Sequence, residues 1–174
     1  MFGLMTKRVD IVDVESNKLG PLKVESKGNF MLNVKVKKTS DKAVLPIRGS
    51  EGAAGFDLTA ATETFRAELS GPIFEYDTHL AFEIPKGHVG LVFPRSSITT
   101  KTSLTLGNSV GVIDSDYRGT IKFQFRTTPP GKKYSVGDRI GQIIIIPIPA
   151  VTFEEVSELD DTKRGEGSFG STGV

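Results

Sequence analysis

The sequence contains no cysteine among its 174 residues and only two histidines, His79 and His88. The absence of cysteine excludes disulfides and thiolate metal sites, and two isolated histidines make a poor histidine-based zinc site. If the protein uses a metal, we therefore expect a hard ion that is held by oxygen atoms.

The chain also lacks an excess of charge and a long apolar segment. Its 22 basic and 21 acidic residues leave a formal net charge of +1. It therefore has no broad electropositive surface of the kind that drives non-specific binding, and polymeric DNA or RNA is not an expected ligand. No run approaches about 18 apolar residues, and no long apolar segment precedes the charges at Lys7 and Arg8. We expect no membrane contact and an intracellular, cytoplasmic protein.

Short segments rich in β-branched and aromatic residues, separated by 19 glycines and 9 prolines, favour strands over helices. Residues 121–125 alternate between apolar and polar side chains, which is typical of a strand with one buried face. Residues 89–93 and 143–146 are continuous apolar runs, which predict strands covered on both faces by a second sheet or by another subunit. Helical periodicity is scarce, and residues 152–159 are the best helix candidate. The pattern predicts an all-β domain.

The two ends of the chain differ in composition from its middle. At 174 residues the length is that of about one domain, and we assign the β domain to residues 39–162. Residues 1–38 form an N-terminal extension whose role the sequence does not specify. Residues 163–174 are Gly-rich and polar, without a core-forming pattern. Such a segment fits a frayed terminus, but the glycines around Phe169 also fit a mobile lid that orders on a ligand.

Five short segments carry more Gly, Asp, Arg or Ser than a strand needs. They are 52–61 (GAAGFDLTAA), 94–97 (PRSS), 111–119 (GVIDSDYRG), 137–142 (GDRIGQ) and 164–173 (RGEGSFGSTG). In this order they closely resemble the conserved motifs of the all-β deoxyuridine triphosphatases (dUTPases), and the resemblance covers residues 39–174. One such match would mean little. Five in the same order make coincidence a poor explanation.

The resemblance implies a fold, an assembly and a reaction. The fold is a jelly-roll-like β domain, and the assembly is a homotrimer in which each site draws motifs from three chains. The reaction is hydrolysis of dUTP to dUMP and pyrophosphate by Mg²⁺-assisted attack of water on the α-phosphorus. This activity would limit the incorporation of uracil into DNA and supply dUMP.

The third motif is expected to carry the chemistry. Asp114 follows the apolar pair Val112 and Ile113, where an unpaired carboxylate is costly to desolvate unless it is hydrogen-bonded or used. By resemblance Asp114 is the general base that takes a proton from the attacking water, a role worth about 10²–10⁴-fold in rate. Asp116 fits a solvated turn equally well.

The same hairpin is expected to select the base and the sugar. By resemblance, uracil is matched by the main chain of Gly111, Val112 and Ile113 and by the side chain of Asn108. Cytosine has the reverse donor and acceptor at its 4-position, and a site built on hydrogen bonds can reject such an analogue by roughly 10⁴–10⁵-fold.

Two further residues are expected to border the nucleoside. The ring of Tyr117 would exclude a ribose 2′-OH, although Tyr117 also fits a half-buried aromatic residue at a strand end. Lys122, on the outgoing strand, would lie beside the nucleoside.

The triphosphate is expected to be held by the second and fourth motifs. Arg95, Ser96 and Ser97 offer a guanidinium, hydroxyls and backbone donors in adjacent positions. By resemblance Ser96 contacts the α–β bridging oxygen and Gln142 contacts a phosphate. In the same motif as Gln142, Asp138 and Arg139 are expected to brace the turn.

The first and fifth motifs complete the expected site. By resemblance Asp57 binds Mg²⁺ through a water molecule, while the metal is chelated by the phosphates. Phe169 would stack on uracil. The γ-phosphate would be covered by Arg164 and by the backbone N–H groups of Gly170, Ser171 and Thr172, so that the tail acts as a lid.

Two alternatives stay open at this point. A dCTP deaminase-like enzyme shares the fold and the Arg-Ser-Ser element, but it needs an acidic residue where Gln124 stands. A non-catalytic or regulatory dUTP-binding member is the second alternative, although Asp114, Ser96 and Asp57 are intact. Ser97 in place of a frequent Gly, and Thr78-His79 in place of a frequent Thr-Gly, are the departures from the usual motifs.

Overall fold

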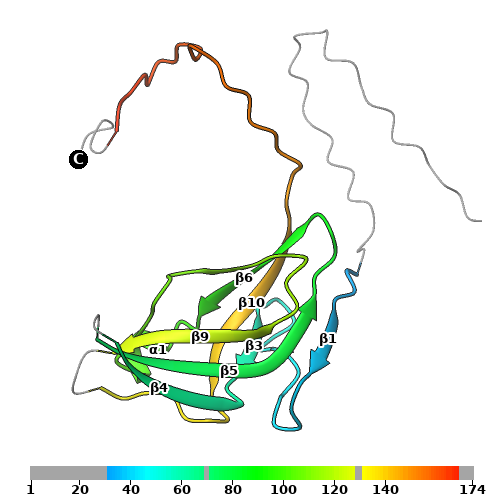
Figure 1. Cartoon of the computed structure of the whole chain (residues 1–174), viewed down its shortest axis with the longest axis vertical. Helices are drawn as coiled ribbons and strands as arrows, with labels where there is room; N and C mark the ends of the chain where they lie inside the picture. The colour runs from blue at the N-terminus through cyan, green and yellow to red at the C-terminus, as the bar shows by residue number, and fades with distance from the viewer. Residues whose placement is uncertain (1–30, 69–70, 128–130, 169–174) are drawn as a thin grey trace, which may run out of the picture. The chain divides into compact units, whose positions relative to one another are not determined.

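The computed structural model describes residues 31–68, 71–127 and 131–168. The chain divides into two units, Met1–Asn33 and Val34–Val174. The second unit contains every strand and the short helix of the described residues (Figure 1).

The first sheet contains five antiparallel strands in the order β1-β5-β9-β7, with β4 also paired to β5. Its strands are β1 (Lys35–Lys38), β4 (Thr62–Glu68), β5 (Gly71–Glu83), β7 (Leu104–Leu106) and β9 (Thr120–Thr127). The long strand β5 pairs with β4 along its first half and with β1 along its second half. Lys35–Lys38, which falls within the predicted extension 1–38, is thus a strand of this sheet.

The second sheet also contains five antiparallel strands, in the order β2-β3-β10-β6-β8. They are β2 (Ile47–Arg48), β3 (Phe56–Thr59), β6 (His88–Pro94), β8 (Gly111–Ile113) and β10 (Arg139–Pro147), and the one-turn helix α1 (Ile98–Lys101) follows β6. The predicted all-β class is confirmed.

Both sheets contribute side chains to a single core. On β9, Ile121, Phe123 and Phe125 are at most 1% exposed, whereas the alternate residues face outward. The core side of β9 packs with Leu58 of β3 and Ile143 of β10, among others. The predicted alternation at 121–125 is therefore confirmed, and it fixes which side of β9 faces outward.

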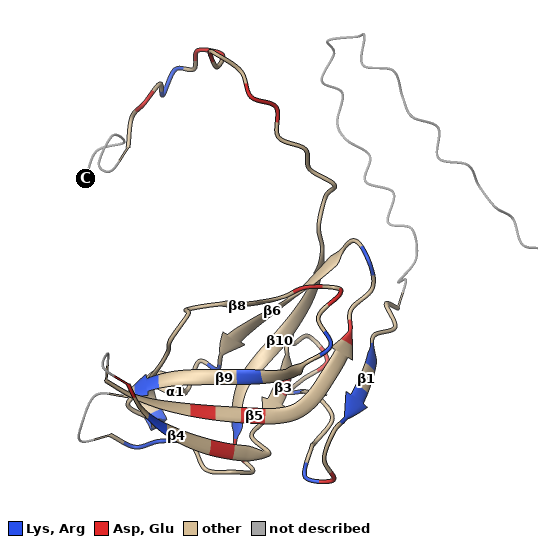
Figure 2. Cartoon of the chain, viewed as in Figure 1, with Lys and Arg blue, Asp and Glu red and all other residues tan. Residues whose placement is uncertain are grey.

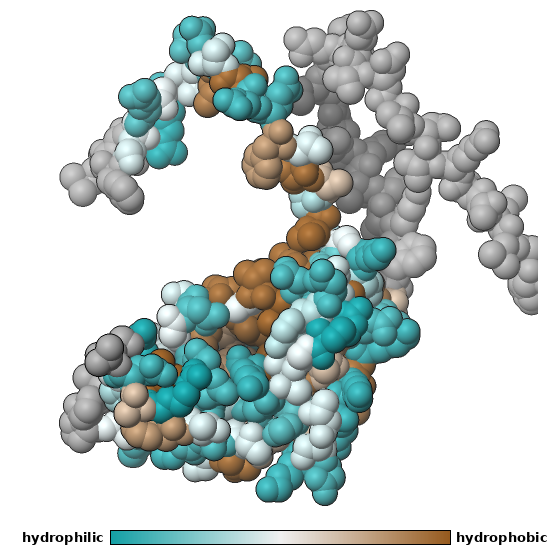
Figure 3. Space-filling model, in the orientation of Figure 1, coloured by the Kyte–Doolittle hydropathy of each residue, from teal (hydrophilic) through white to brown (hydrophobic). Residues whose placement is uncertain are grey.

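The apolar runs 89–93 and 143–146 form the neighbouring strands β6 and β10, and the core covers one face of each. The other face carries Leu91 of β6 and Ile144 and Ile146 of β10, and it continues onto Val112 of the neighbouring strand β8. We call these four residues the outer apolar patch. Leu91 pairs with both Ile144 and Val112, so these side chains share a face. Val112 is 62% exposed and Ile146 37% exposed in the single chain, and Figure 3 shows apolar residues gathered over β10.

The helix suggested for residues 152–159 is wrong. The described residues after β10, 148–168, contain neither a helix nor a strand. Phe153 is 98% exposed, so this segment buries no apolar face within the described chain, and a short helix without such packing is marginal in water. No helix in the described part of the chain is long and apolar enough to cross a membrane.

Candidate active site

Two arginines converge on Asp57 at one end of the second sheet. Asp57 lies on β3, which pairs with β10, and β10 pairs in turn with β6. Arg95 Nε, just after β6, donates to Asp57 Oδ1 at 3.1 Å, and Arg139 Nη1, at the start of β10, donates to Asp57 Oδ2 at 2.9 Å. The Asp57 side chain is 12% exposed. We call these three residues the arginine cluster.

The arginine cluster is a local excess of positive charge. One carboxylate faces two guanidinium groups, and Arg95 donates from Nε only, so its terminal nitrogens have no hydrogen-bond acceptor among the described residues. Guanidinium groups held in this way are suited to bind phosphate oxygens in charge-assisted hydrogen bonds. The contact between Arg139 and Asp57 was missed by the sequence analysis, because strand pairing brings together residues 82 positions apart.

Gln142 lies beside the arginine cluster, and its side chain lies against Gly55 of the first motif. Its Nε2 donates to the carbonyl of Pro94 at 3.3 Å, and it pairs with Asp57 across the strands. A Cβ atom added to Gly55 would lie 2.4 Å from Gln142 Oε1, so a larger residue at this position would displace the Gln142 side chain. Asp138 Oδ2 accepts from Ser135 N at 2.7 Å, which confirms that Asp138 braces its turn.

The two serines after Arg95 differ in exposure. Ser96 is exposed, whereas the Oγ atom of Ser97 is buried. The Ser97 hydroxyl and the Tyr134 hydroxyl are the two buried side-chain polar atoms with no hydrogen-bond partner among the described residues. Ser97 also stands at the N-cap of α1 without capping it through its side chain.

Asp114 is exposed at the end of β8. Its carbonyl accepts from Tyr117 N at 3.2 Å, and Arg118 Nη1 donates to Ser115 O at 2.8 Å, so backbone contacts fix the turn. The Asp114 carboxylate receives no hydrogen bond within the described residues. The desolvated position suggested by its apolar neighbours is therefore not found in the single chain, since Val112 is also exposed.

Tyr117 folds back over the end of the same turn. Its hydroxyl donates to Thr120 O at 3.3 Å, and its side chain stays 44% exposed. A Cβ atom on Gly119 would lie 2.2 Å from the Tyr117 hydroxyl oxygen. Gly119 therefore permits the position of the ring.

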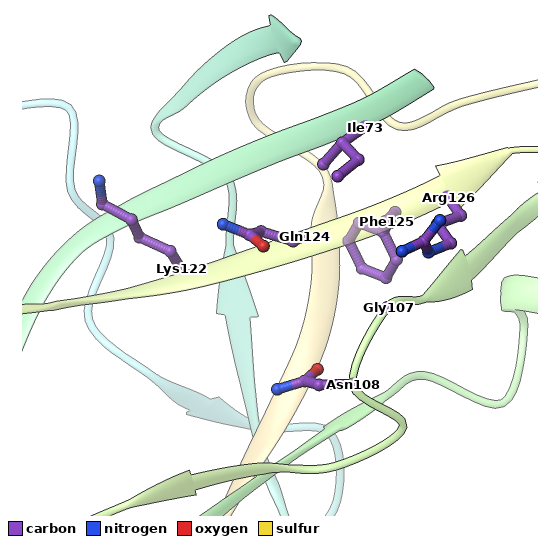
Figure 4. A pocket seen from close by; sticks show the side chains of 7 residues that line it. All are labelled: Ile73, Gly107, Asn108, Lys122, Gln124, Phe125 and Arg126. Atoms are coloured by element: carbon purple, nitrogen blue, oxygen red, sulfur yellow. The ribbon is translucent and has the colours of Figure 1, made fainter. Parts of the chain in front are cut away.

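A cavity of about 250 Å³ lies beside the loop after β7. It is lined by Ile73, Gly107, Asn108, Lys122, Gln124, Phe125 and Arg126 (Figure 4). Gly107 N donates to Gln124 O at 2.8 Å and holds the loop against β9. The structure thus brings together Asn108 and Lys122, two of the predicted nucleoside residues, and adds Gln124, which the motifs do not include. We call this space the base-side cavity.

Asp114 and the arginine cluster lie at opposite ends of β6. Ile113 pairs with Gly90, so Asp114 lies beside Val89, whereas Arg95 follows the other end of the strand. At about 3.3 Å per residue, the six steps from Val89 to Arg95 span about 20 Å. One α-phosphate cannot contact Asp114 and Ser96 of the same chain.

The fifth motif is described only in part. Arg164 Nε donates to Gly167 O at 2.9 Å, and Gly165 adopts a φ of 52° in the same turn. Phe169, Gly170, Ser171 and Thr172, with the contacts predicted for them, lie outside the described residues.

A two-sheet β domain that carries the arginine cluster, the base-side cavity and Gly-rich motifs fits a nucleotide-binding protein of the all-β class. Residues 41–173 match the dUTPase family model. The chain belongs to the dUTPase family.

The relatives agree in sequence and in fold. The chain is 45% identical over 141 residues to the mitochondrial deoxyuridine 5′-triphosphate nucleotidohydrolase of Dictyostelium discoideum, a match that covers 80% of this chain and 76% of the relative. The identity is 42% over 142 residues to the enzyme of that name from Corynebacterium glutamicum, with 80% and 94% covered. The Staphylococcus bacteriophage 80alpha dUTPase with dUPNHPP superposes with a TM-score of 0.71 at 26% identity, with 83% and 100% covered.

Proposed function

We propose that this chain hydrolyses dUTP to dUMP and pyrophosphate. The observation that carries the proposal is the arginine cluster, with partly exposed guanidinium groups at the end of the second sheet. The base-side cavity adds a place for a base on the same fold. The relatives are named as deoxyuridine triphosphate nucleotidohydrolases, and the solved phage 80alpha dUTPase holds an analogue of the substrate.

The working site is shared between chains of a homotrimer. The distance of about 20 Å along β6 separates the Asp114 carboxylate from Ser96 within one chain, so a second chain must supply one of the two. The outer apolar patch supports this assembly, since Val112 and Ile146 expose apolar surface beside Asp114 and along β10.

Each part of the site has a distinct role in the reaction. Asp114 takes a proton from the water that attacks the α-phosphorus, and Ser96 donates a hydrogen bond to the bridging oxygen as pyrophosphate leaves. Gln142 and Arg95 hold the phosphates together with the backbone N–H of Ser97, whose hydroxyl is buried. The main chain from Gly111 to Ile113 matches uracil.

The remaining predicted residues surround the nucleoside and close the site. Asn108 and Lys122 lie beside the base, and Tyr117 contacts the sugar. The segment 163–174 closes over the nucleotide, with Phe169 on the base and the γ-phosphate held by Arg164, Gly170, Ser171 and Thr172.

The residues present fit Mg²⁺ that is bound mainly by the substrate. Among the described residues, no group of three or more acidic or histidine side chains could hold a metal ion, so phosphates and water must supply most ligands. Asp57 would accept from a metal-bound water after its arginines turn to the phosphates. The metal, when bound, neutralises phosphate charge. A dUTPase of an S. aureus phage, 24% identical, is described with a structural Mg(II) ion.

We place the protein inside the cell, without assigning its compartment. The Dictyostelium relative is described as mitochondrial, and another relative, 38% identical, comes from Paramecium bursaria Chlorella virus 1. The role of residues 1–34, which precede strand β1 (Lys35–Lys38), stays unassigned.

Pyrophosphate release from dUTP, measured beside dUTP binding, tests the proposal. The purified chain should release pyrophosphate and dUMP in equal amounts and should require Mg²⁺. Binding without turnover would support a non-catalytic member instead. Release of ammonia from dCTP would instead support a deaminase. Gln124 could not be the general base of that reaction.

A further inference from the structure

Strand β5 contains an irregular segment opposite the start of β9. Asp77 pairs with Lys122 and Ala81 with Thr120, so four steps along β5 face two steps along β9. We call this part of β5, from Asp77 to Ala81, the β5 bulge. Within it His79 has a φ of 51°, a left-handed conformation that residues other than glycine seldom adopt. His79 stands where the resembling family frequently has Gly, so its conformation needs support that a glycine would not need.

Side-chain hydrogen bonds stabilise the β5 bulge. Asp77 Oδ1 accepts from His79 N at 2.7 Å, and Thr78 Oγ1 donates to Ile121 O at 2.9 Å. Each ring nitrogen of His79 also lies 3.2 Å from a threonine hydroxyl. Bulges are over-represented beside active sites, where they aim side chains. The contacts of this bulge with β9 are therefore of interest for the nucleoside site.

The second oxygen of Asp77 reaches across to β9. Asp77 Oδ2 accepts from Thr120 Oγ1 at 2.8 Å, and the Asp77 side chain is 15% exposed. The carbonyl of Thr120 in turn accepts from the Tyr117 hydroxyl at 3.3 Å. One carboxylate thus connects the β5 bulge to the residue that the Tyr117 ring contacts.

A charged neighbour, Lys122, contributes less to this arrangement. Lys122 Nζ lies 3.8 Å from Asp77 Oδ2 but 3.3 Å from Glu75 Oε1. The hydrogen bond and the charge of Glu75 raise the pKa of Lys122 most, and the charge of Asp77 adds a smaller increase. Figure 2 shows acidic positions on β5 beside the basic position on β9. The close partners of Asp77 are therefore the hydrogen-bond donors of His79 and Thr120.

We propose that Asp77 is a positioning residue for sugar selection, because through Thr120 it fixes the ring of Tyr117. The inference rests on the proposed function, in which this ring excludes a ribose 2′-OH. The Tyr117 side chain is 44% exposed, and within the described residues its hydroxyl bonds to the Thr120 carbonyl alone. Few other contacts restrain the ring, so a displacement of Thr120 would free it and leave space for the 2′-OH.

The experiment compares kcat/KM for dUTP and UTP in the full-length protein and its variants. Asp77→Ala and Thr120→Val each remove the hydrogen bond between these two side chains, and each should lower the dUTP-to-UTP ratio by about 10-fold. The change should come chiefly from a lower KM for UTP, because neither side chain is placed at the reacting atoms. The double variant should lower the ratio no further than either single variant, since both changes remove one shared interaction.

Two controls separate the hydrogen bond from the charge. Asp77→Asn can accept from His79 N through its oxygen and donate to the Thr120 hydroxyl through its nitrogen, so it should keep the wild-type ratio. Glu75→Gln removes the carboxylate nearer to Lys122 without touching Thr120, and it should keep the ratio as well. A ratio in Asp77→Asn as low as that in Asp77→Ala would mean that the charge is required, which overturns the proposed link.

A measurement without turnover separates this inference from the proposed function. The chain has three tyrosines, so fluorine NMR after labelling with 3-fluorotyrosine gives one signal for each, and Tyr117→Phe assigns the signal of Tyr117. That signal should shift in Asp77→Ala and in Thr120→Val and should keep its wild-type position in Asp77→Asn. Thermal denaturation identifies the folded variants, and Thr120→Val carries the test if Asp77→Ala does not fold.

The outcomes are distinguishable. If the Tyr117 signal keeps its position in every folded variant, the link is overturned even when dUTP is hydrolysed. If the signal shifts and the dUTP-to-UTP ratio does not change, the role in sugar selection is overturned. If the wild-type protein does not hydrolyse dUTP, the proposed function fails, and equal dUMP-to-UMP binding ratios across the variants, measured by calorimetry, would overturn the role of Asp77 as well.

Discussion

Mixing two inactive variants tests whether the site is shared between chains. Asp114→Asn removes the proposed base and should lower turnover by about 10²–10⁴-fold, and Ser96→Ala removes the hydroxyl at the other end of β6. In a trimer built at random from equal amounts, a site is intact only when the chain that gives the hairpin carries Asp114 and the chain that gives the second motif carries Ser96. Each condition holds for half of the chains, so about a quarter of the sites should recover.

The assay is pyrophosphate release after the two variants are unfolded and refolded together, with subunit exchange checked by native mass spectrometry. The control is a mixture of Arg95→Ala with Ser96→Ala. One chain supplies both residues to a given site, so no chain of this mixture has an intact second motif. If mixed trimers of Asp114→Asn and Ser96→Ala form and show no recovery, the reasoning from the β6–β8 register is refuted. Recovery in the control mixture would refute it as well.

Three further results are expected. Gly119→Ala should displace the Tyr117 ring, since its Cβ would lie 2.2 Å from the hydroxyl oxygen. Because this ring is proposed to exclude the ribose 2′-OH, the variant should relax discrimination against UTP, and an unchanged UTP-to-dUTP ratio would contradict this. Gly141→Ala should lower the free energy of unfolding by about 1–3 kcal/mol in urea titrations, because its Cβ would lie 2.2 Å from the buried ring of Phe123. The pKa of Glu75 is lowered in the folded state, so its carboxylate stabilises the fold above the unfolded pKa, and this contribution is lost as the pH falls through the folded pKa. Glu75→Gln should therefore weaken the pH dependence of stability below about pH 5, measured as acid unfolding by circular dichroism.

The sequence predicted the class of fold because strand periodicity is local. The alternation at 121–125 is set by the pleat of one strand, and it survives in β9 with Phe123 fully buried. The environment of each face could not be predicted for the runs 89–93 and 143–146. Only the strand pairing shows that one face meets the core and the other carries the outer apolar patch. The helix at 152–159 failed because helical residues without a face to bury do not sustain a helix.

The contacts of the candidate site could be predicted only where the two partners lie close together in the sequence. Asp138 braces its turn through Ser135, three residues away. Arg139 and Asp57, by contrast, meet through the pairing of β3 with β10, and Gln124 meets Glu75 through the pairing of β9 with β5. These contacts join distant positions, and neither residue type nor local spacing signals them. A polar residue on the outward face of a predicted strand, such as Gln124, was the available hint.

Because of the register of β6 with β8, the proposed shared site makes the specific activity depend on the concentration of the protein. Under the proposed shared site, a single chain carries both Asp114 and Ser96 but cannot use them on one phosphate, so an isolated chain is expected to be inactive. Specific activity should therefore fall steeply on dilution below the dissociation constant of the assembly. A cell that makes little of this protein would lose turnover faster than it loses protein.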